Sequence, residues 1–496
     1  MDSGQYQKWT LWLIFGLLAI RLFVLFLNPL GLHGDEAQYW AWSNDLDWGY
    51  FTKPPLIAWV IWTTTTLFGD AEWAVRLSSA PLHAVTTYVV FLTARKLFGA
   101  RAGFWAAAIY ALMPAQWLSS QIVSTDVPLL LCYALALNAW AYLRTDGNTW
   151  PRTVQLGLAI GLGMLAKYAM LFFLPALLFA VFLDRETRKA LLSINGLVVL
   201  IIAAALITPN ILWNLNNQFA TLSHTAANAN MEAGPSFHPA KFMKFLGDQF
   251  GVFGPISFGL LIVALIFGVS GRAGREARLL SVFALTPLLA ICVQALLSRA
   301  NANWAVTTYV SGAILLGYVA TNYWLKLRKL LAAGLMVQAV VGTVLISALI
   351  SPALTDMFGL SNSVKRLREW PQTVQVLETV IADGHEGKTF QAVMVDKRII
   401  YYDLSYYGLH NAAPLYMWKL RQDPENHAEL TASPPVFDVA SGPILFVNYT
   451  EHYIDEMGED FQRLEALPPL DIKLGGGKRR QLRLWAGYGF TPTQSR

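Results

Sequence analysis

Long apolar runs separated by short polar gaps make up most of the chain before Pro352. The runs lie at about 9–30, 73–97, 104–118, 127–143, 154–165, 169–183, 191–207, 255–269, 279–297, 304–324 and 330–350. A helix needs about 20 mostly apolar residues to cross the hydrocarbon core of a bilayer. The pattern therefore predicts a polytopic α-helical membrane protein with about eleven transmembrane helices. The two short runs on either side of Lys167 fit either two spans or one broken, re-entrant hairpin.

The composition agrees with a membrane protein. Only 14% of the residues are charged and the mean hydropathy is +0.41, whereas soluble proteins carry about 25% charged residues. The net charge of +5 would suggest a nucleic-acid partner in a soluble protein, but here the basic residues gather between apolar runs. Cys132 and Cys292 lie inside apolar runs, so we expect neither a disulfide framework nor a cysteine-ligated metal.

Basic residues occupy every second gap. Because cytoplasmic loops carry the excess of Lys and Arg, this alternation predicts a cytoplasmic N-terminus and a C-terminus outside. The first run then remains in the protein as a signal anchor. The basic gaps contain Arg95, Lys96 and Arg101; Arg144 and Arg152; Arg185, Arg188 and Lys189; Arg272, Arg275 and Arg278; and Lys326, Arg328 and Lys329.

The composition becomes that of a soluble protein after Pro352. Strand-like and helix-like runs predict a small extracytoplasmic α/β domain at 353–496. The strand-like runs are 390–395, 444–447 and 481–485, and the helix-like run is 364–381. Three glycines at 475–477 lack the spacing of a nucleotide-binding loop and predict a hairpin turn. Residues 1–352 would form the transmembrane domain, with outer loops at 31–72 and 210–254 and an amphipathic segment at 239–250.

The first outer loop brings acidic, aromatic and basic residues close together in the chain. Its residues 31–59 read GLHGDEAQYWAWSNDLDWGYFTKPPLIAW. Asp35 and Glu36 come first, aromatic residues follow, and Lys53 stands directly before two prolines. Because the prolines restrict the backbone, we expect Lys53 on a short, stiff, extended turn. In a simpler interpretation, Asp35 caps a helix at 36–44 and Lys53 reaches the membrane surface.

Four more charged residues lie at the outer ends of predicted spans. They are Arg21, Asp126, Lys167 and Arg299. A charge within a membrane costs roughly 3 kcal/mol or more unless it is paired or hydrated. All four share the side of Asp35 and Lys53, which favours one polar cavity over six unrelated charges. Each residue alone also fits a helix cap or a contact with lipid headgroups.

These residue types suit the transfer of a group from a lipid phosphate. Cationic side chains stabilise a phosphate as negative charge grows on it, and a carboxylate can accept the proton of an attacking hydroxyl. No cytoplasmic loop contains a nucleotide-phosphate motif. An activated donor would therefore have to be carried in the membrane.

The motifs resemble those of the integral-membrane glycosyltransferases of the C-type (GT-C) fold that use polyprenyl-phosphate sugars. The sequence is most similar to the bacterial branch with the lipid A aminoarabinose transferases, the lipopolysaccharide galacturonosyltransferases and relatives of the protein O-mannosyltransferases. The resemblance covers most of the membrane half. The matching motifs are Asp35-Glu36-Ala37-Gln38-Tyr39-Trp40, Lys53-Pro54-Pro55-Leu56, residues 121–128, Lys167-Tyr168, residues 209–217 and Ala302-Asn303-Trp304.

The resemblance implies roles for residues of these motifs. Asp35 and Asp126 match catalytic acids, and Glu36 would orient the loop or bind a metal. Lys53 matches the lysine that contacts the carrier phosphate, and Lys167 and Arg299 are added from their position. The candidates for substrate binding are Tyr39, Trp40, Tyr168 and Asn303. The spacing requires no metal, although a divalent ion could take ligands from His33, Asp35, Glu36 and His224.

The sequence thus predicts an inverting glycosyltransferase of a bacterial inner membrane. It would move a monosaccharide from a polyprenyl-phosphate carrier to lipid A or the lipopolysaccharide core on the periplasmic face. A protein acceptor, as in O-mannosylation, is the first alternative. A transporter is the second, because many spans with intramembrane charges would also suit one. The lack of an internal repeat and the gathering of charges on one side argue against transport.

Overall fold

The chain folds into two compact units. The computed structural model describes residues 3–228, 237–323 and 325–492. Unit 1 comprises Met1–Leu27, Lys53–Gly69 and Arg76–Ser347, and unit 2 comprises Asn28–Thr52, Asp70–Val75 and Ala348–Arg496. The first outer loop is therefore divided, and most of it belongs with the C-terminal residues and not, as predicted, with the membrane domain.

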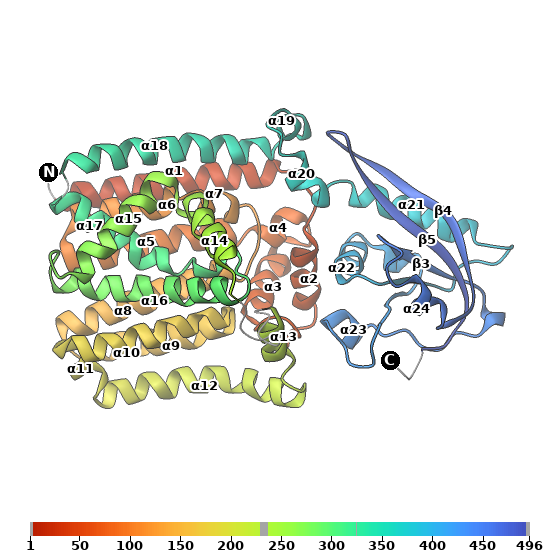
Figure 1. Cartoon of the computed structure of the whole chain (residues 1–496), viewed down its shortest axis with the longest axis horizontal. Coiled ribbons are helices and arrows are strands. Elements are labelled where there is room, and N and C mark those ends of the chain that lie inside the picture. The colour runs from red at the N-terminus through yellow and green to blue at the C-terminus, as the bar shows by residue number, and fades with distance from the viewer. Residues whose placement is uncertain (1–2, 229–236, 324, 493–496) are drawn as a thin grey trace. The chain divides into compact units, whose positions relative to one another are not determined.

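Unit 1 is built from helices in its described residues (Figure 1). They are α1 (Ser3–Leu27), α3 (Leu56–Phe68), α5 (Ser79–Phe98), α6 (Ala100–Leu112), α7 (Pro114–Ser119), α8 (Asp126–Asp146), α9 (Trp150–Ala166), η1 (Tyr168–Phe172), α10 (Phe173–Leu183), α11 (Arg185–Leu191), α12 (Ile194–Asn216), α13 (Ala220–Asn228), α14 (Pro239–Phe253), α15 (Pro255–Val269), α16 (Arg275–Leu297), η2 (Ala302–Ala305), α17 (Thr308–Asn322) and α18 (Leu325–Ala348).

Small residues let the helices of unit 1 approach closely. α17 packs on α6, and a Cβ added at Gly317 would lie 2.7 Å from the backbone nitrogen of Ala106. A larger residue at either position would force the two helices apart. Such small-residue contacts are typical of helix pairs in membranes, where burial of apolar surface does not drive association. Most side chains of α8 are buried, and this helix contacts α5 and α9.

The prediction of a polytopic helical membrane protein is confirmed, but the helices differ in length from the predicted spans. Among the described residues, six helices are long and apolar enough to cross a membrane, or up to eight if two bent pairs each count as one span. Each of the eleven apolar runs contains a helix. However, α6, α9 and α17 have 13, 17 and 15 residues, fewer than the roughly 20 of a simple span.

The second outer loop begins later than predicted. α12 continues through Pro209 to Asn216, so residues 210–216 are helical. Apolar helices tolerate such a proline because neighbouring groups satisfy the freed backbone. The amphipathic segment expected at 239–250 is confirmed as α14. Residues 229–236 of the predicted loop, and residue 324 at the end of one predicted run, lie outside the described residues.

Unit 2 contains a five-stranded sheet with short helices. The strands are β1 (Ala392–Val395), β2 (Leu415–Met417), β3 (Ile444–Asn448), β4 (Phe461–Gly475) and β5 (Lys478–Phe490). Their order is β2-β1-β3-β5-β4, with β1 parallel to β2 and β3 and the other pairs antiparallel. The helices are α2 (Gly34–Ser43), α4 (Glu72–Arg76), α19 (Pro352–Met357), α20 (Ser361–Val364), η3 (Lys365–Leu367), α21 (Trp370–Asp383), α22 (Arg398–Tyr406), η4 (Leu409–Asn411), α23 (His427–Thr431), η5 (Val439–Ser441) and α24 (Ile454–Gly458).

The three predicted strands correspond to β1, β3 and part of β5, whereas β2 and β4 were missed. β4 and β5 form a long hairpin (Figure 1), and Gly475, Gly476 and Gly477 join them with φ of 79°, 53° and 71°. These positive angles explain why the turn consists of glycine. The helix expected at 364–381 is broken at Glu369, whose φ is 59°, and α21 begins only at Trp370.

A buried carboxyl at the end of β1 makes the stability of unit 2 depend on pH. The side chain of Asp396 is only 4% exposed, and burial raises its pKa to about 6, with Lys397 opposing this shift. Because the pKa is higher in the folded than in the unfolded chain, the folded state binds the proton more tightly. This carboxyl therefore costs stability as the pH rises from about 4 to about 6.

We predict that Asp396→Asn removes this pH dependence. The stability gained over the wild type should be near zero at pH 4, grow up to pH 6 and then stay constant, at about 3 kcal/mol at most. Thermal unfolding of the full chain, followed by tryptophan fluorescence, measures it. Asp423→Asn, at an exposed position, is the control. An equal gain at pH 4 and pH 7 would contradict the prediction.

Candidate active site

The start of α2 leaves the carboxylate of Asp35 available. The N-cap is His33, whose Nδ1 accepts a hydrogen bond from the backbone N–H of Asp35 at 3.2 Å. Glu36 completes the capping box, because its Oε2 accepts from the backbone N–H of His33 at 2.9 Å. Glu36 is 2% exposed, and its roles in orienting the loop or binding a metal stay predictions. The simpler interpretation, in which Asp35 is the cap, is wrong.

Asp35 pairs with a residue that the sequence analysis missed. Nη1 of Arg398 donates to Oδ1 of Asp35 at 2.9 Å, and the same nitrogen also donates to Oε1 of Gln38. Asp35 remains 44% exposed and Arg398 32% exposed. The two partners are 363 positions apart in the chain. No motif marks Arg398, so only the folded unit reveals this contact.

Close packing of α2 on α22 creates this pair. The two helices lie against each other in unit 2, and a Cβ added at Gly34 would collide with Ile399. The preceding segment is held too. The backbone N–H of Gly31 donates to the Leu367 carbonyl at 2.9 Å, and that of Leu32 donates to the hydroxyl of Tyr407 at 3.0 Å. The acidic loop is thus fixed by the C-terminal part of unit 2.

The two aromatic candidates of the loop lie in different environments. Tyr39 is 7% exposed and packs on Trp42 with ring centroids 5.4 Å apart. Its ring belongs to the core, and its role in substrate binding stays a prediction. Trp40 is partly buried; its indole N–H donates to Oδ1 of Asp70 at 2.7 Å and its ring meets the edge of Tyr406. Trp40 therefore also helps to hold the loop.

Three predicted site residues come together in unit 1. α9 ends at Ala166, and Lys167 has an extended backbone with φ of −164° and ψ of 136° before η1 begins. Its Nζ donates to Oδ1 of Asp126 at 2.6 Å, and Nδ2 of Asn303 donates to Oδ2 of Asp126 at 2.6 Å. The break between the helices thus brings the lysine to the start of α8, where Asp126 accepts bonds on both oxygens.

Tyr168 connects η1 with α12. Its hydroxyl donates to Oδ1 of Asn210 at 2.8 Å and accepts from Nδ2 of Asn214 at 3.3 Å. Both asparagines belong to the predicted motif at 209–217, so two of the motifs meet at this point. The hydroxyl of Tyr168 therefore helps to fix the two helices next to Lys167.

Arg21 is buried among the helices of unit 1, so it does not line an open polar cavity as expected. It is 2% exposed, its Nη2 donates to the Ala111 carbonyl at 2.8 Å, and its guanidinium lies over the ring of Trp117. Ala111 lies in the last turn of α6, where carbonyls have no partner within the helix. Arg21 satisfies one of these carbonyls, so its role is structural.

The remaining predicted residues lie in turns of unit 1. Lys53 is partly buried in a bend at 51–53 that precedes α3. Arg299 is exposed on the loop between α16 and η2. Within the described residues, no group of three or more His, Cys, Asp or Glu side chains could hold a metal ion. The phosphate-binding roles of Lys53 and Arg299 stay predictions.

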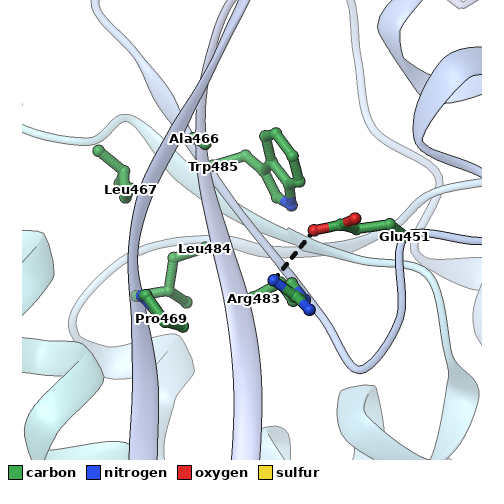
Figure 2. A pocket seen from close by; sticks show the side chains of 7 residues that line it. All are labelled: Glu451, Ala466, Leu467, Pro469, Arg483, Leu484 and Trp485. Carbon is green, nitrogen blue, oxygen red and sulfur yellow. Dashed lines mark ion pairs between the residues drawn. The ribbon is translucent and has the colours of Figure 1, made fainter.

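A small pocket lies on β4 and β5 in unit 2 (Figure 2). It is lined by Glu451, Ala466, Leu467, Pro469, Arg483, Leu484 and Trp485. Glu451 and Arg483 form an ion pair of 3.0 Å, and the indole nitrogen of Trp485 points toward it (Figure 2). The pocket's volume is about 50 Å³, which holds a few water molecules but not a sugar.

We predict that Lys167→Met destabilises unit 1 by about 2 kcal/mol or more, because it leaves the mostly buried carboxylate of Asp126 without its cation. The lysine and aspartate side chains are 20% and 13% exposed. Lys244→Met is the matched control, since Lys244 pairs with Asp248 at 2.7 Å but is 76% exposed. This control should cost less than about 0.5 kcal/mol. Equal losses in thermal melts of the two variants would contradict the prediction.

Known proteins resemble this chain in sequence and in fold. A family described as dolichyl-phosphate-mannose-protein mannosyltransferase matches residues 52–213. A lipid A galacturonosyltransferase, RgtD of Rhizobium johnstonii, is 35% identical over 316 residues, which are 63% of this chain and 66% of that protein. An undecaprenyl phosphate-α-4-amino-4-deoxy-L-arabinose arabinosyl transferase of Pseudomonas fluorescens is 28% identical over 42% of this chain and 39% of its own length.

The same fold occurs in a solved structure over nearly the whole length. ArnT from Cupriavidus metallidurans bound to undecaprenyl phosphate has a TM-score of 0.65 and 17% identity, and the match covers 98% of this chain and 99% of that chain. The identity is low, so this likeness concerns the fold alone. The chain is thus similar in sequence to sugar transferases whose names include lipid A or undecaprenyl phosphate, and similar in fold to ArnT, and it spans 66% or less of the length of these sequence relatives.

Proposed function

We propose that this protein transfers a monosaccharide from a polyprenyl-phosphate carrier to lipid A or the lipopolysaccharide core. The observation that carries the proposal is that the carboxylate of Asp35 is partly exposed and held in place by Arg398. The His33 and Glu36 cap leaves this carboxylate out of the helix start, and it stays 44% exposed although Arg398 holds one of its oxygens. A partly exposed carboxylate that is fixed on a rigid helix suits a group that receives a proton.

The proposed reaction is a direct displacement at the anomeric carbon. The acceptor oxygen forms a bond to this carbon while the bond from the carbon to the carrier phosphate breaks. The leaving phosphate keeps the electron pair and needs no acid, because it is already a stable anion that Lys53 can stabilise. The proton of an acceptor hydroxyl passes to Asp35. If the acceptor is a phosphate of lipid A, it needs little activation, and Asp35 mainly orients it.

Asp126 has a different part in this proposal. It binds Lys167 and Asn303 through both of its oxygens, so it is not an open base. We infer that it fixes these two side chains, whose remaining donors face a carrier phosphate or a sugar. Arg299, four positions before Asn303, is a further candidate for the phosphate.

We also propose the predicted topology. The chain would cross a bacterial inner membrane about eleven times, with the N-terminus in the cytoplasm and an α/β domain at 353–496 in the periplasm. The alternation of basic gaps supports this topology. The short helices α6, α9 and α17 would cross with the help of the adjacent turns α7, η1 and η2.

A protein acceptor is the competing proposal. The description of the matching family names protein mannosyltransferases, and neither Asp35 nor Lys53 distinguishes a lipid acceptor from a protein acceptor. The test must therefore examine both glycolipids and proteins.

We predict that Asp35→Asn abolishes one sugar modification of the envelope. Mass spectrometry of lipid A, the lipopolysaccharide core and envelope proteins compares cells with the wild type, without the protein, and with each variant. Lipid A or core should lose one sugar mass in the cells without the protein, and Asp35→Asn should reduce transfer by about 100-fold or more. Asp45→Asn, exposed just after α2, is the control and should keep the modification.

The outcomes separate the candidates. Loss confined to proteins would replace the lipid acceptor by a protein acceptor. Unchanged glycans with reduced uptake of a solute would overturn the transferase and favour a transporter.

A further inference from the structure

We propose that Arg398 is the positioning residue for Asp35, and that the C-terminal part of the chain thereby contributes to the active site. This inference rests on the proposed function. Arg398 touches Asp35 and not the reacting atoms, so it would act by orienting the carboxylate and favouring its ionised form. Nothing in the membrane motifs points to this role, because Arg398 lies outside all of them.

The geometry of the pair fits a positioning role. Nη1 of Arg398 lies 2.9 Å from Oδ1 of Asp35, within the range of a charge-assisted hydrogen bond. It engages one carboxylate oxygen and also binds Oε1 of Gln38, one turn further along α2. The other oxygen of Asp35, Oδ2, lies 3.8 Å from Nδ1 of His33. An arginine that binds residues one turn apart fixes both the carboxylate and the helix that carries it.

Arg398 is itself held by the sheet. β1 is the central strand of the parallel part of the sheet, between β2 and β3, and its four residues are buried. Arg398 follows β1 after two residues and is the first residue of α22. The next residues, Ile399 and Ile400, pack against Gly34 and into the core, respectively. The backbone that carries the guanidinium therefore belongs to a rigid element, as precise positioning requires.

The Asp35–Arg398 pair lies among other acidic side chains. Asp35 and Glu36 are adjacent, and Asp403 of α22 lies near both. Burial raises the pKa of Asp403 well above its ordinary value; Arg480 opposes this shift, and the negative charges of Asp35 and Glu36 reinforce it. Among these acidic groups, Arg398 places a guanidinium directly on the carboxylate of Asp35.

The network also reaches the residue next to Lys53. Gln38, the second partner of Arg398, donates from Nε2 to the hydroxyl of Thr52 at 3.2 Å. Thr52 is 5% exposed and directly precedes Lys53 in the chain. A substitution of Arg398 would thus disturb Asp35 directly and would disturb Thr52, the residue before the lysine, only through Gln38.

The test compares variants of Arg398 in the purified full chain. Donor and acceptor are those that the mass-spectrometric experiment identifies. We expect Arg398→Gln to lower kcat by about 100-fold, as for a misplaced reacting group, with KM for both substrates within about threefold of wild type. Arg398→Lys should recover at least tenfold of this loss, because it restores the charge without the fork of the guanidinium. Arg421→Gln, an exposed residue that pairs with Glu425 in the same unit, should behave like wild type.

A double variant separates positioning from direct binding. In an Asp35→Asn background, Arg398→Gln should lower the residual rate by no more than about twofold. The effects of substituting two residues that act as one unit do not add. A further 100-fold loss would mean that Arg398 acts on the substrate independently and would overturn the inference. A change in KM alone, or a kcat within twofold of wild type for both Arg398 variants, would also overturn it.

The controls distinguish failure of this inference from failure of the proposed function. If the wild-type protein transfers no sugar, the function itself fails. If the wild-type protein transfers the sugar and the Arg398 variants have the same kcat as Arg421→Gln, only the inference fails. Should Arg398→Gln not fold, Arg398→Lys decides: a kcat about tenfold below wild type with an unchanged melting temperature supports positioning, and an unchanged kcat contradicts it.

Discussion

The capping of α2 is the interaction on which the candidate site depends. A helix starting at Gly34 leaves backbone N–H groups without partners, and Asp35 could satisfy one of them. His33 and Glu36 do so instead, and this arrangement leaves the carboxylate of Asp35 partly exposed. Glu36 is therefore buried in the capping box, while the carboxylate of Asp35 lies outside it. One capping box thus gives two adjacent carboxylates different environments, which is the basis of the role proposed for Asp35.

The second constraint is that the acidic loop belongs to the same compact unit as the C-terminal residues. Gly34 allows α2 to lie against Ile399, and the backbone of Gly31 and Leu32 binds groups far along the chain. A loop of this length without such contacts would adopt many conformations. The sheet of unit 2 therefore gives Asp35 a fixed place, which is the condition for general base catalysis.

Much of the membrane fold could be predicted because hydropathy is a local property. Each apolar run indeed contains a helix, but the continuation of α12 through Pro209 was missed because proline is a weak helix breaker among apolar helices. The short β2 and the bulged β4, with prolines at 468 and 469, show weak strand patterns. Both strands depend on their neighbours more than on their own residues.

The candidate site was predicted only where its residues lie in motifs or share a side of the membrane. Asp126, Lys167 and Asn303 come together in unit 1. Arg398 could not be found, because its contact with Asp35 joins residues 363 positions apart. Tyr39 was assigned to substrate binding because a run of aromatic residues gives no sign of which rings face the core. The contact of Arg21 was not predicted, because a span end does not reveal a carbonyl such as that of Ala111, which has no partner within its own helix and accepts from Arg21.

The most direct test of the account is a balance of both products in one reaction. Purified protein is mixed with an undecaprenyl-phosphate-linked sugar and lipid A, and the glycolipid product and free undecaprenyl phosphate are measured together. The account predicts that they appear in equal amounts with inverted configuration at the anomeric carbon, and that Asp35→Asn stops both. Release of undecaprenyl phosphate without a glycosylated acceptor, or a product with retained configuration, would contradict it.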